Sequence, residues 1–171
     1  SEPDGNLLGI GPSVSNPLTG EIISADVVNK LLAIKLGYNY RKLYGYTEDN
    51  DPLMQYITNL TLHEVGHVLG LRHNFRGSYL YSPDEIHDKN ITGNVLMSSV
   101  MDYDPINIAP EGVDQGIYFS TEPGVYDKWA VKFGYTPNLT DEERTALLQQ
   151  SVKRELTFGT DDDAMSYPGN N

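Results

Sequence analysis

Residues 63–73, with the sequence HEVGHVLGLRH, constrain this chain more than any other segment. Residues four apart lie on the same face of an α-helix, so His63 and His67 can bind one metal ion. Gly70 can adopt the left-handed backbone conformation without steric cost, which lets the chain leave the helix and turns His73 back towards the same ion. The spacing therefore predicts a metal site with three histidine ligands.

Glu64 adds a candidate catalytic group to this segment. It directly follows the first histidine, close enough to poise a metal-bound water without being a ligand itself. Three histidine ligands leave a fourth position open for water, which distinguishes a catalytic zinc site from a closed structural one. Three of the chain's four histidines fall within these eleven residues, a clustering that ordinary residue frequencies rarely produce. We therefore predict one catalytic Zn²⁺ ion.

This segment resembles the extended zinc-binding motif of the metzincin metallopeptidases, and a second segment strengthens the resemblance. Residues 98–103, Ser-Ser-Val-Met-Asp-Tyr, are similar to the methionine-containing turn that lies beneath the zinc in metzincins. The resemblance implies that Met101 forms an apolar floor under the three imidazoles, a position suited to a polarisable side chain.

Tyr103 lies two residues after this methionine, as in the astacin-like and serralysin-like branches of the family. The resemblance implies that its hydroxyl is a fifth metal ligand in the resting enzyme. The same hydroxyl then becomes a hydrogen-bond donor to the tetrahedral intermediate. The alternative is a tyrosine that only packs, in a chain that contains twelve of them.

Two further segments resemble the substrate-binding parts of metzincins. Residues 16–26 look like the turn and edge strand that precede the zinc helix in bacterial members, although a plain hairpin is the alternative. The resemblance implies that an extended substrate pairs with this edge at Glu21, Ile22, Ile23, Ser24 and Ala25. The segment after the methionine turn is expected to wall the pocket for the residue that follows the cleaved bond, through Pro105, Ile106, Asn107, Ile108 and Ala109.

The implied activity is that of a zinc-dependent endopeptidase acting on a peptide or protein substrate, with Glu64 transferring the proton from the attacking water to the leaving amine. One alternative is a non-catalytic binding module in which zinc has a structural role, which the intact Glu64 disfavours. Another is a zincin whose third ligand is Glu85 rather than His73. The spacing from Gly70 to His73 and the methionine turn both disfavour it.

Composition bounds the remaining possibilities. The 171 residues suffice for one globular domain, with 39% hydrophobic residues, and a net charge of −12 makes nucleic acid and anionic membranes poor partners. There is no cysteine and no apolar run of membrane-spanning length. Bound Ca²⁺ is compatible with the acidity, but no ring of oxygen ligands is recognisable. We expect a monomer that is secreted or periplasmic.

The expected fold is α+β and metzincin-like. Fewer strands precede the zinc helix than in metzincin catalytic domains, so the resemblance implies a reduced or truncated upper β-sheet subdomain. Below it we expect a central zinc-binding helix and a mainly helical lower subdomain. Residues 1–171 then form a single catalytic domain, interpreted as a fragment of a larger protein.

Periodicity and turn residues predict where the elements lie. Strands are expected at 7–14 and 21–25, helices at 27–44, 52–69 and 123–133, and a last helix from the capping box at Thr140 to about residue 155. Residues 74–97 are expected to form a loop and 158–171 a loose tail. The predicted core positions of the zinc helix are Leu53, Ile57, Leu60, Val68 and Leu71.

Overall fold

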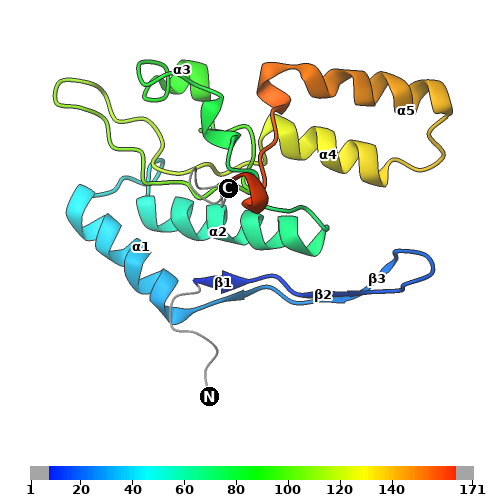
Figure 1. Ribbon diagram of the computed structural model, residues 1–171. Helices are drawn as coiled ribbons and strands as arrows, with labels where there is room; N and C mark the ends of the chain where they lie inside the picture. The colour runs from blue at the N-terminus through cyan, green and yellow to red at the C-terminus, as the bar shows by residue number, and fades with distance from the viewer. Residues whose placement is uncertain (1–7, 165–171) are drawn as a thin grey trace, which may run out of the picture.

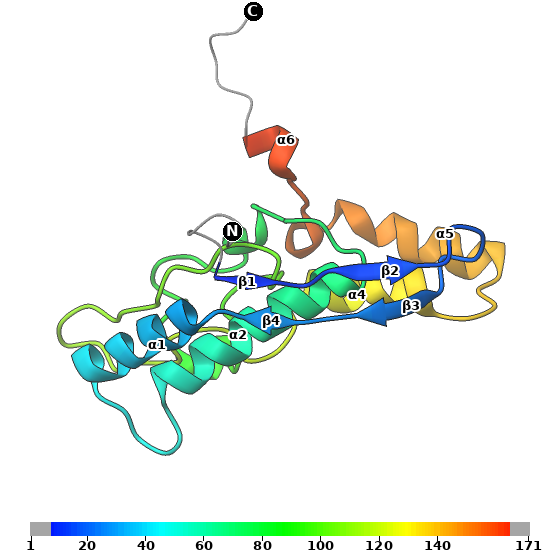
Figure 2. The same ribbon diagram turned by 90° about the horizontal axis from the view of Figure 1, so that it is seen from below.

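The computed structural model describes residues 8–164, which are arranged around one central helix, α2 (Figure 1). A ribbon of short strands runs along one side of α2, and the α4–α5 pair lies on the opposite side (Figures 1 and 2). The predicted α+β class with a small sheet, a central helix and a mainly helical lower part is confirmed. The elements are β1 (Gly9–Ile10), β2 (Ser13–Ser15), β3 (Ile22–Ala25), β4 (Val28–Asn29), α1 (Leu31–Tyr44), α2 (Pro52–Val68), η1 (Gly77–Tyr79), α3 (Lys89–Thr92), α4 (Val125–Tyr135), α5 (Asp141–Leu148), η2 (Gln149–Val152), η3 (Arg154–Leu156) and α6 (Asp161–Ala164).

The strands form two small antiparallel sheets. β1 pairs with β4 and β2 pairs with β3, with Gly9 opposite Asn29 and Ser13 opposite Ala25. The single strand predicted at 7–14 is therefore interrupted, at Gly11 and Pro12. Proline has no backbone N–H to donate, which explains why the hydrogen-bonded ladder breaks there.

Helix α1 begins four residues later than predicted. Val28 and Asn29 pair with β1 instead of entering the helix, and the Lys30 N–H donates to the Leu8 carbonyl at 2.9 Å. Strand pairing therefore overrides the helical periodicity of residues 27–30. α1 packs against α2 at Gly37, where a Cβ atom would lie 2.8 Å from a methyl carbon of Leu53.

Helix α2 begins where its capping residues predict. The Asp51 side chain accepts a hydrogen bond from the Leu53 N–H at 3.0 Å, and Pro52 occupies the first turn. Of its five predicted core positions, Leu60 packs against the buried core, but all five residues are only half-buried. The interior face instead carries the buried Gln55 and Tyr56, together with the residues of the motif.

The interior is held together by aromatic packing and by side-chain hydrogen bonds to irregular segments. Tyr40, Tyr56 and Phe119 form one cluster, with ring centroids 5.1–5.7 Å apart. The Gln55 carbonyl accepts hydrogen bonds from the Tyr118 and Phe119 N–H groups at 2.7 and 3.2 Å. Irregular segments lack the regular backbone hydrogen bonds of helices and sheets. Side-chain hydrogen bonds therefore satisfy the backbone groups that are buried in these segments. The loop predicted at 74–97 is observed, interrupted only by η1 and α3.

The C-terminal part is mainly helical. α4 spans Val125–Tyr135, close to the predicted range, and the predicted capping box at Thr140 and Glu143 is confirmed. The last helix does not continue to residue 155, because α5 ends at Leu148 and gives way to η2 and η3 around an extended Lys153. Within the described residues, no helix is long and apolar enough to cross a membrane.

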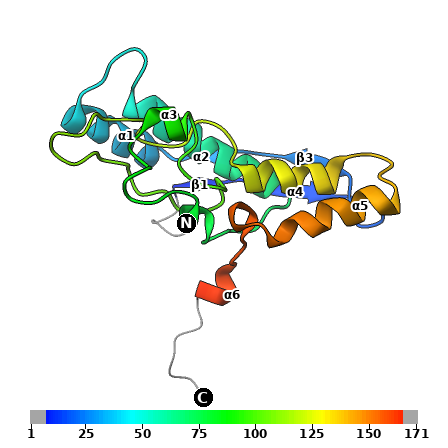
Figure 3. The same ribbon diagram turned by 90° about the horizontal axis from the view of Figure 1, so that it is seen from above.

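The segment that follows η3 corrects the prediction of a loose tail from residue 158. The Phe158 ring stacks on Tyr126, with centroids 5.7 Å apart and planes at 14°, and Gly159 is buried. The chain then enters α6, which projects from the packed helices (Figure 3). The acidic composition of this segment gives no sign of the aromatic stack or of the buried backbone hydrogen bonds that hold it. Residues 165–171 lie outside the described residues.

Candidate metal centre

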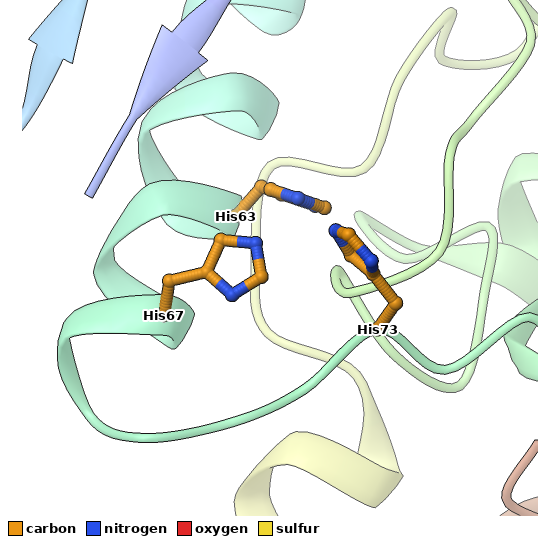
Figure 4. A group of neighbouring side chains, drawn as sticks. All are labelled: His63, His67 and His73. Atoms are coloured by element: carbon orange, nitrogen blue, oxygen red, sulfur yellow. The ribbon is translucent and has the colours of Figure 1, made fainter. Parts of the chain in front are cut away.

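The three histidines of the motif converge on one point. His63 and His67 project from α2 and His73 from the loop that follows it, with their rings facing a common space (Figure 4). The nitrogen atoms available as ligands lie within 4.8 Å of one another. Gly70 has a φ of +82°, so the turn that returns His73 to the site uses the left-handed conformation expected of glycine.

Each imidazole is fixed by a hydrogen bond at Nδ1. His63 Nδ1 lies 2.8 Å from the Val100 carbonyl and His67 Nδ1 lies 3.0 Å from the Leu71 carbonyl. His73 Nδ1 lies 2.9 Å from a carboxylate oxygen of Asp161. All three partners only accept, so each Nδ1 carries the proton and each Nε2 presents its lone pair to the site.

The electrostatic environment favours the neutral imidazoles that bind metal ions. Burial lowers the pKa of His63 to about 4, and burial also lowers the pKa of His67. Neutral Nε2 donors from three histidines, with room for a fourth ligand, suit the tetrahedral preference of Zn²⁺. The residues present therefore fit the predicted metal.

Glu64 is buried beside this cluster, under the first strand. A Cβ atom on Gly9 would lie 2.5 Å from Glu64 Oε1, and one on Gly11 would overlap the Glu64 carbonyl. Only a strand with glycine at both positions can cross α2 this closely. Burial raises the pKa of the Glu64 carboxyl, which moves it towards the range of a general base that works near neutral pH.

The predicted methionine turn lies beneath the motif. Met101 is fully buried, and Gly66 has no space for a Cβ atom because the Met101 sulfur occupies it. Asp127 of α4 holds the turn: its carboxylate accepts hydrogen bonds from the Ser99 hydroxyl at 2.6 Å and from the Val100 N–H at 2.8 Å. The same Val100 carries the carbonyl that fixes His63, so the turn orients a metal ligand.

Tyr103 stands at the open side of the site. Its hydroxyl lies 2.9 Å from His73 Nε2, and its ring stacks on His63 with centroids 5.3 Å apart. Because His73 Nδ1 holds the ring proton, the hydroxyl is the donor in this pair. Burial, followed by the charges of Asp161 and Glu64, raises the pKa of Tyr103, so its hydroxyl keeps its proton at neutral pH.

A cavity of about 690 Å³ opens onto the histidines. Its walls come from β1 and the two residues after it, from α1 and α2, and from the segment after Met101. The lining residues include Leu8, Gly9, Ile10, Gly11, Pro12, Leu36, Tyr40, Tyr56, Leu60 and Asp104. The walls are thus mainly apolar and the floor carries the candidate metal ligands, an arrangement typical of ligand-binding pockets.

The residues predicted to bind substrate do not line this cavity. Glu21, Ile22, Ile23, Ser24 and Ala25 lie in or beside β3, which pairs with β2, whereas the strand that borders the cavity is β1. The segment that borders the cavity is thus the one at residues 9–12, and substrate pairing at residues 21–25 stays a prediction. The hairpin signal at residues 16–26 identified strands, but a local pattern does not reveal which strand faces the helix.

The predicted pocket wall at Ile106, Asn107 and Ile108 stays a prediction: these residues do not line the cavity, and the first two support the chain. Ile106 packs against the aromatic cluster, and Asn107 is buried with its amide donating to the Ile86 and Ile117 carbonyls at 3.2 and 2.9 Å. Ile108 is exposed. An asparagine that satisfies two buried carbonyls has a structural role.

Together with Glu64 and Asp102, Asp104 is one of the acidic residues that line the cavity. The Asn59 side chain donates to its Oδ2 atom at 3.2 Å, while its buried Oδ1 atom has no hydrogen-bond partner among residues 8–164. Burial, together with the nearby charge of Asp102, raises the pKa of Asp104 to about 7. The wall of the cavity therefore contains a carboxyl group whose pKa lies near neutral pH.

The alternative third ligand, Glu85, does not join the histidines. Its carboxylate accepts a hydrogen bond from the Ser82 N–H at 2.9 Å within its own loop. In the part of the chain that the structure describes, the metal-ligating cluster comprises His63, His67 and His73. Asp161, the first residue of the acidic run 161–163, contacts His73 through its carboxylate.

Four residues that contact the site are not predicted from the sequence. Gly9 and Gly11 let the strand approach Glu64, Asp127 holds the methionine turn, and Asp161 holds His73. Glycines at alternate positions of a strand were an available signal, because they mark a close backbone approach. The two aspartates had none, since each acts on residues far away in the sequence.

Three imidazoles, an adjacent buried glutamate and an underlying methionine turn define a zinc metallopeptidase-like site of the metzincin type. Comparison of the sequence with known families agrees with this geometry. A model of the Met-zincin family matches residues 46–171, and the chain belongs to that family. No curated protein and no solved structure matches the chain.

Proposed function

We propose that this protein is a zinc-dependent endopeptidase that hydrolyses peptide bonds in extended segments of peptides or proteins. The observation that carries the proposal is the placement of Glu64, buried beside three histidines whose Nε2 atoms face an open cavity. Structural zinc sites usually have four protein ligands, whereas catalytic sites have three and leave a position for water beside a carboxylate.

The proposed chemistry divides between the metal and the side chains. His63, His67 and His73 would hold a zinc ion, which would supply Lewis-acid chemistry by acidifying water and polarising a carbonyl group. Glu64 accepts a proton as the water oxygen bonds to the scissile carbonyl carbon, and delivers it to the nitrogen as the C–N bond breaks. The protonated hydroxyl of Tyr103 donates a hydrogen bond to the oxyanion that forms.

The strand beside the site supports an extended substrate. Within residues 8–164, β1 pairs with β4 alone, so its other edge has no strand partner. The strand that carries this edge lines the cavity, as do residues 11 and 12. A peptide can pair with it as an additional antiparallel strand and pass across the metal, which allows cleavage within a chain. The apolar walls at Leu36, Tyr40 and Leu60 suit a hydrophobic side chain of the substrate.

The test is proteolysis of a denatured protein mixture by the zinc-loaded chain, with new termini mapped by mass spectrometry. The wild type is compared with Glu64→Gln, which keeps the shape of the side chain but removes its basicity. Glu85→Gln is the matched control, since this carboxylate lies outside the cluster. Zinc content after dialysis is measured for all three proteins.

We expect internal cuts from the wild type that a zinc chelator abolishes. Glu64→Gln should retain zinc and lose turnover by a factor of about 10² to 10⁴, the usual contribution of a general base, while Glu85→Gln keeps both. Unchanged hydrolysis by Glu64→Gln would remove Glu64 from this role. A folded, zinc-bound wild type that makes no cuts would support a non-catalytic binding module instead.

A further inference from the structure

We propose that Asp161 is a positioning residue for the third metal ligand, and that residues 157–161 act as a C-terminal strap that completes the metal centre. The inference rests on the zinc site of the proposed function. It concerns metal affinity, which can be measured whether or not the protein cleaves peptides. Asp161 follows His73 by 88 residues, so the site closes only when the last described part of the chain is in place.

The strap is fixed to the loop that carries His73 by the buried side chain of Asn74. The Asn74 amide donates to the Thr157 carbonyl at 3.1 Å, and its Oδ1 atom accepts from the Gly159 N–H at 3.0 Å. The Phe75 N–H donates to the Gly159 carbonyl at 2.8 Å. Three hydrogen bonds in succession give the strap a defined register on this loop.

That register brings Asp161 to His73. One carboxylate oxygen lies 2.9 Å from His73 Nδ1, and the other lies 3.7 Å from the guanidinium of Arg72. A carboxylate that accepts from Nδ1 fixes the tautomer and the ring plane of a metal-binding histidine, and raises the basicity of its Nε2 atom. Asp161 therefore presents His73 to the metal.

The other two ligands show why His73 needs such a partner. His63 and His67 are carried by α2 and are oriented by backbone carbonyls of Val100 and Leu71. His73 lies beyond Gly70, outside any helix or strand, and its Nε2 atom already accepts a hydrogen bond from Tyr103. Without a hydrogen-bond partner from elsewhere in the chain, the ring of His73 would lack the fixed orientation that His63 and His67 have on their helix.

The test measures zinc dissociation constants by competition with a chromogenic chelator at fixed pH. Asp161→Ala removes the acceptor, and Asp161→Asn keeps an oxygen at the same position without the charge. Asp162→Ala is the matched control, because Asp162 is its exposed neighbour. Melting temperatures of the metal-free proteins report whether the fold is retained. Asp161→Ser, polar but too short to reach His73, replaces the alanine variant if that variant does not fold.

We expect Asp161→Ala to weaken zinc binding by about 10- to 100-fold, the usual effect of losing such a partner. Asp161→Asn should recover part of the loss, and Asp162→Ala should match the wild type. In a His73→Ala background, Asp161→Ala should cause no further loss, because its action passes through His73. Equal affinities for Asp161→Ala and Asp162→Ala, or the same loss with and without His73, would overturn the proposal. A wild type that binds no zinc would instead refute the proposed function.

Discussion

The two halves of the metal centre are built in different ways. The helix half comprises His63, Glu64 and His67, and one continuous helix fixes their spacing. The loop half comprises His73 and the methionine turn around Met101, both in irregular backbone. The spacing of the helix half follows from 3.6-residue periodicity, and backbone carbonyls orient its two histidines. The loop half depends on side chains supplied from α4 and from the C-terminal strap.

This difference locates where the site is vulnerable. An irregular segment has no regular backbone bonds of its own, so each buried polar group must find a partner elsewhere. Asp127 and Asp161 are those partners, 27 and 88 residues away from the groups that they hold. Changes in the loop half should therefore have larger consequences than comparable changes that affect the helix half.

The largest expected effect is that of Asp127→Ala, which removes the acceptor for the Ser99 hydroxyl and for the Val100 and Gly124 N–H groups. These donors are buried, and leaving a buried donor unpaired costs about 1–3 kcal/mol. Allowing for water to satisfy part of the loss, we expect unfolding of the metal-free protein to become easier by about 2–4 kcal/mol. Chemical denaturation monitored by circular dichroism measures this change.

Asp114→Ala provides the matched control for that variant, because Asp114 is an exposed loop residue. Its effect should stay within about 0.5 kcal/mol, as for most surface substitutions. If the two variants unfold at the same denaturant concentration, α4 does not hold the methionine turn and the proposed contrast between the halves fails.

The helix half was predictable from the sequence because its information is local. The spacing of His63 and His67, the cap at Asp51 and the turn at Gly70 each act within a few residues. Resemblance supplied Met101 in addition. Asp161 was not predictable, since its acidic run reads as a solvated surface until the backbone bonds of Gly159 bring it to His73.

The fold shows the same limit. The start of α2 and the capping box at Thr140 follow from short-range chemistry, and the sequence locates both. The start of α1 was misplaced because Val28 pairs with Ile10, a contact between distant residues. The orientation of the ribbon, with β1 rather than β3 at the cavity, depends on the glycines that let β1 approach Glu64. Tertiary packing decides such choices, not propensity.

The contact between the halves is tested by Gly66→Ala. A methyl group at this position meets the Met101 sulfur, so either the helix or the turn must shift. Overpacking of this kind costs about 1–3 kcal/mol.

Gly134→Ala is the control: it also changes a helical glycine, but a Cβ there meets nothing within 4 Å. Alanine should stabilise that position by up to about 1 kcal/mol. Equal stabilities of the two variants would show that Met101 does not pack tightly under α2.

The smallest expected effect concerns the start of the helix half, at Asp51. Its carboxylate caps α2 through the Leu53 N–H and accepts a hydrogen bond from Arg41 Nε at 3.0 Å. The Arg41 hydrogen bond lowers the pKa of Asp51 below its ordinary value of 3.8. Because the folded state favours the ionised form, the stabilisation is complete above pH 3.8 and is lost as the pH falls through the lowered value.

Asp51→Ala should therefore destabilise the protein by about 1 kcal/mol at neutral pH, the usual cost of losing a helix N-cap. The difference from the wild type should shrink as the pH falls below 3.8, since protonation removes the same charge from the wild type. Melting temperatures between pH 7 and pH 2 follow this convergence, with Asp49→Ala as the exposed control. Curves that stay parallel down to pH 2 would show that the cap acts through its shape and not through its charge. The ion pair between Asp51 and Arg41 of α1 would then not stabilise the helix half.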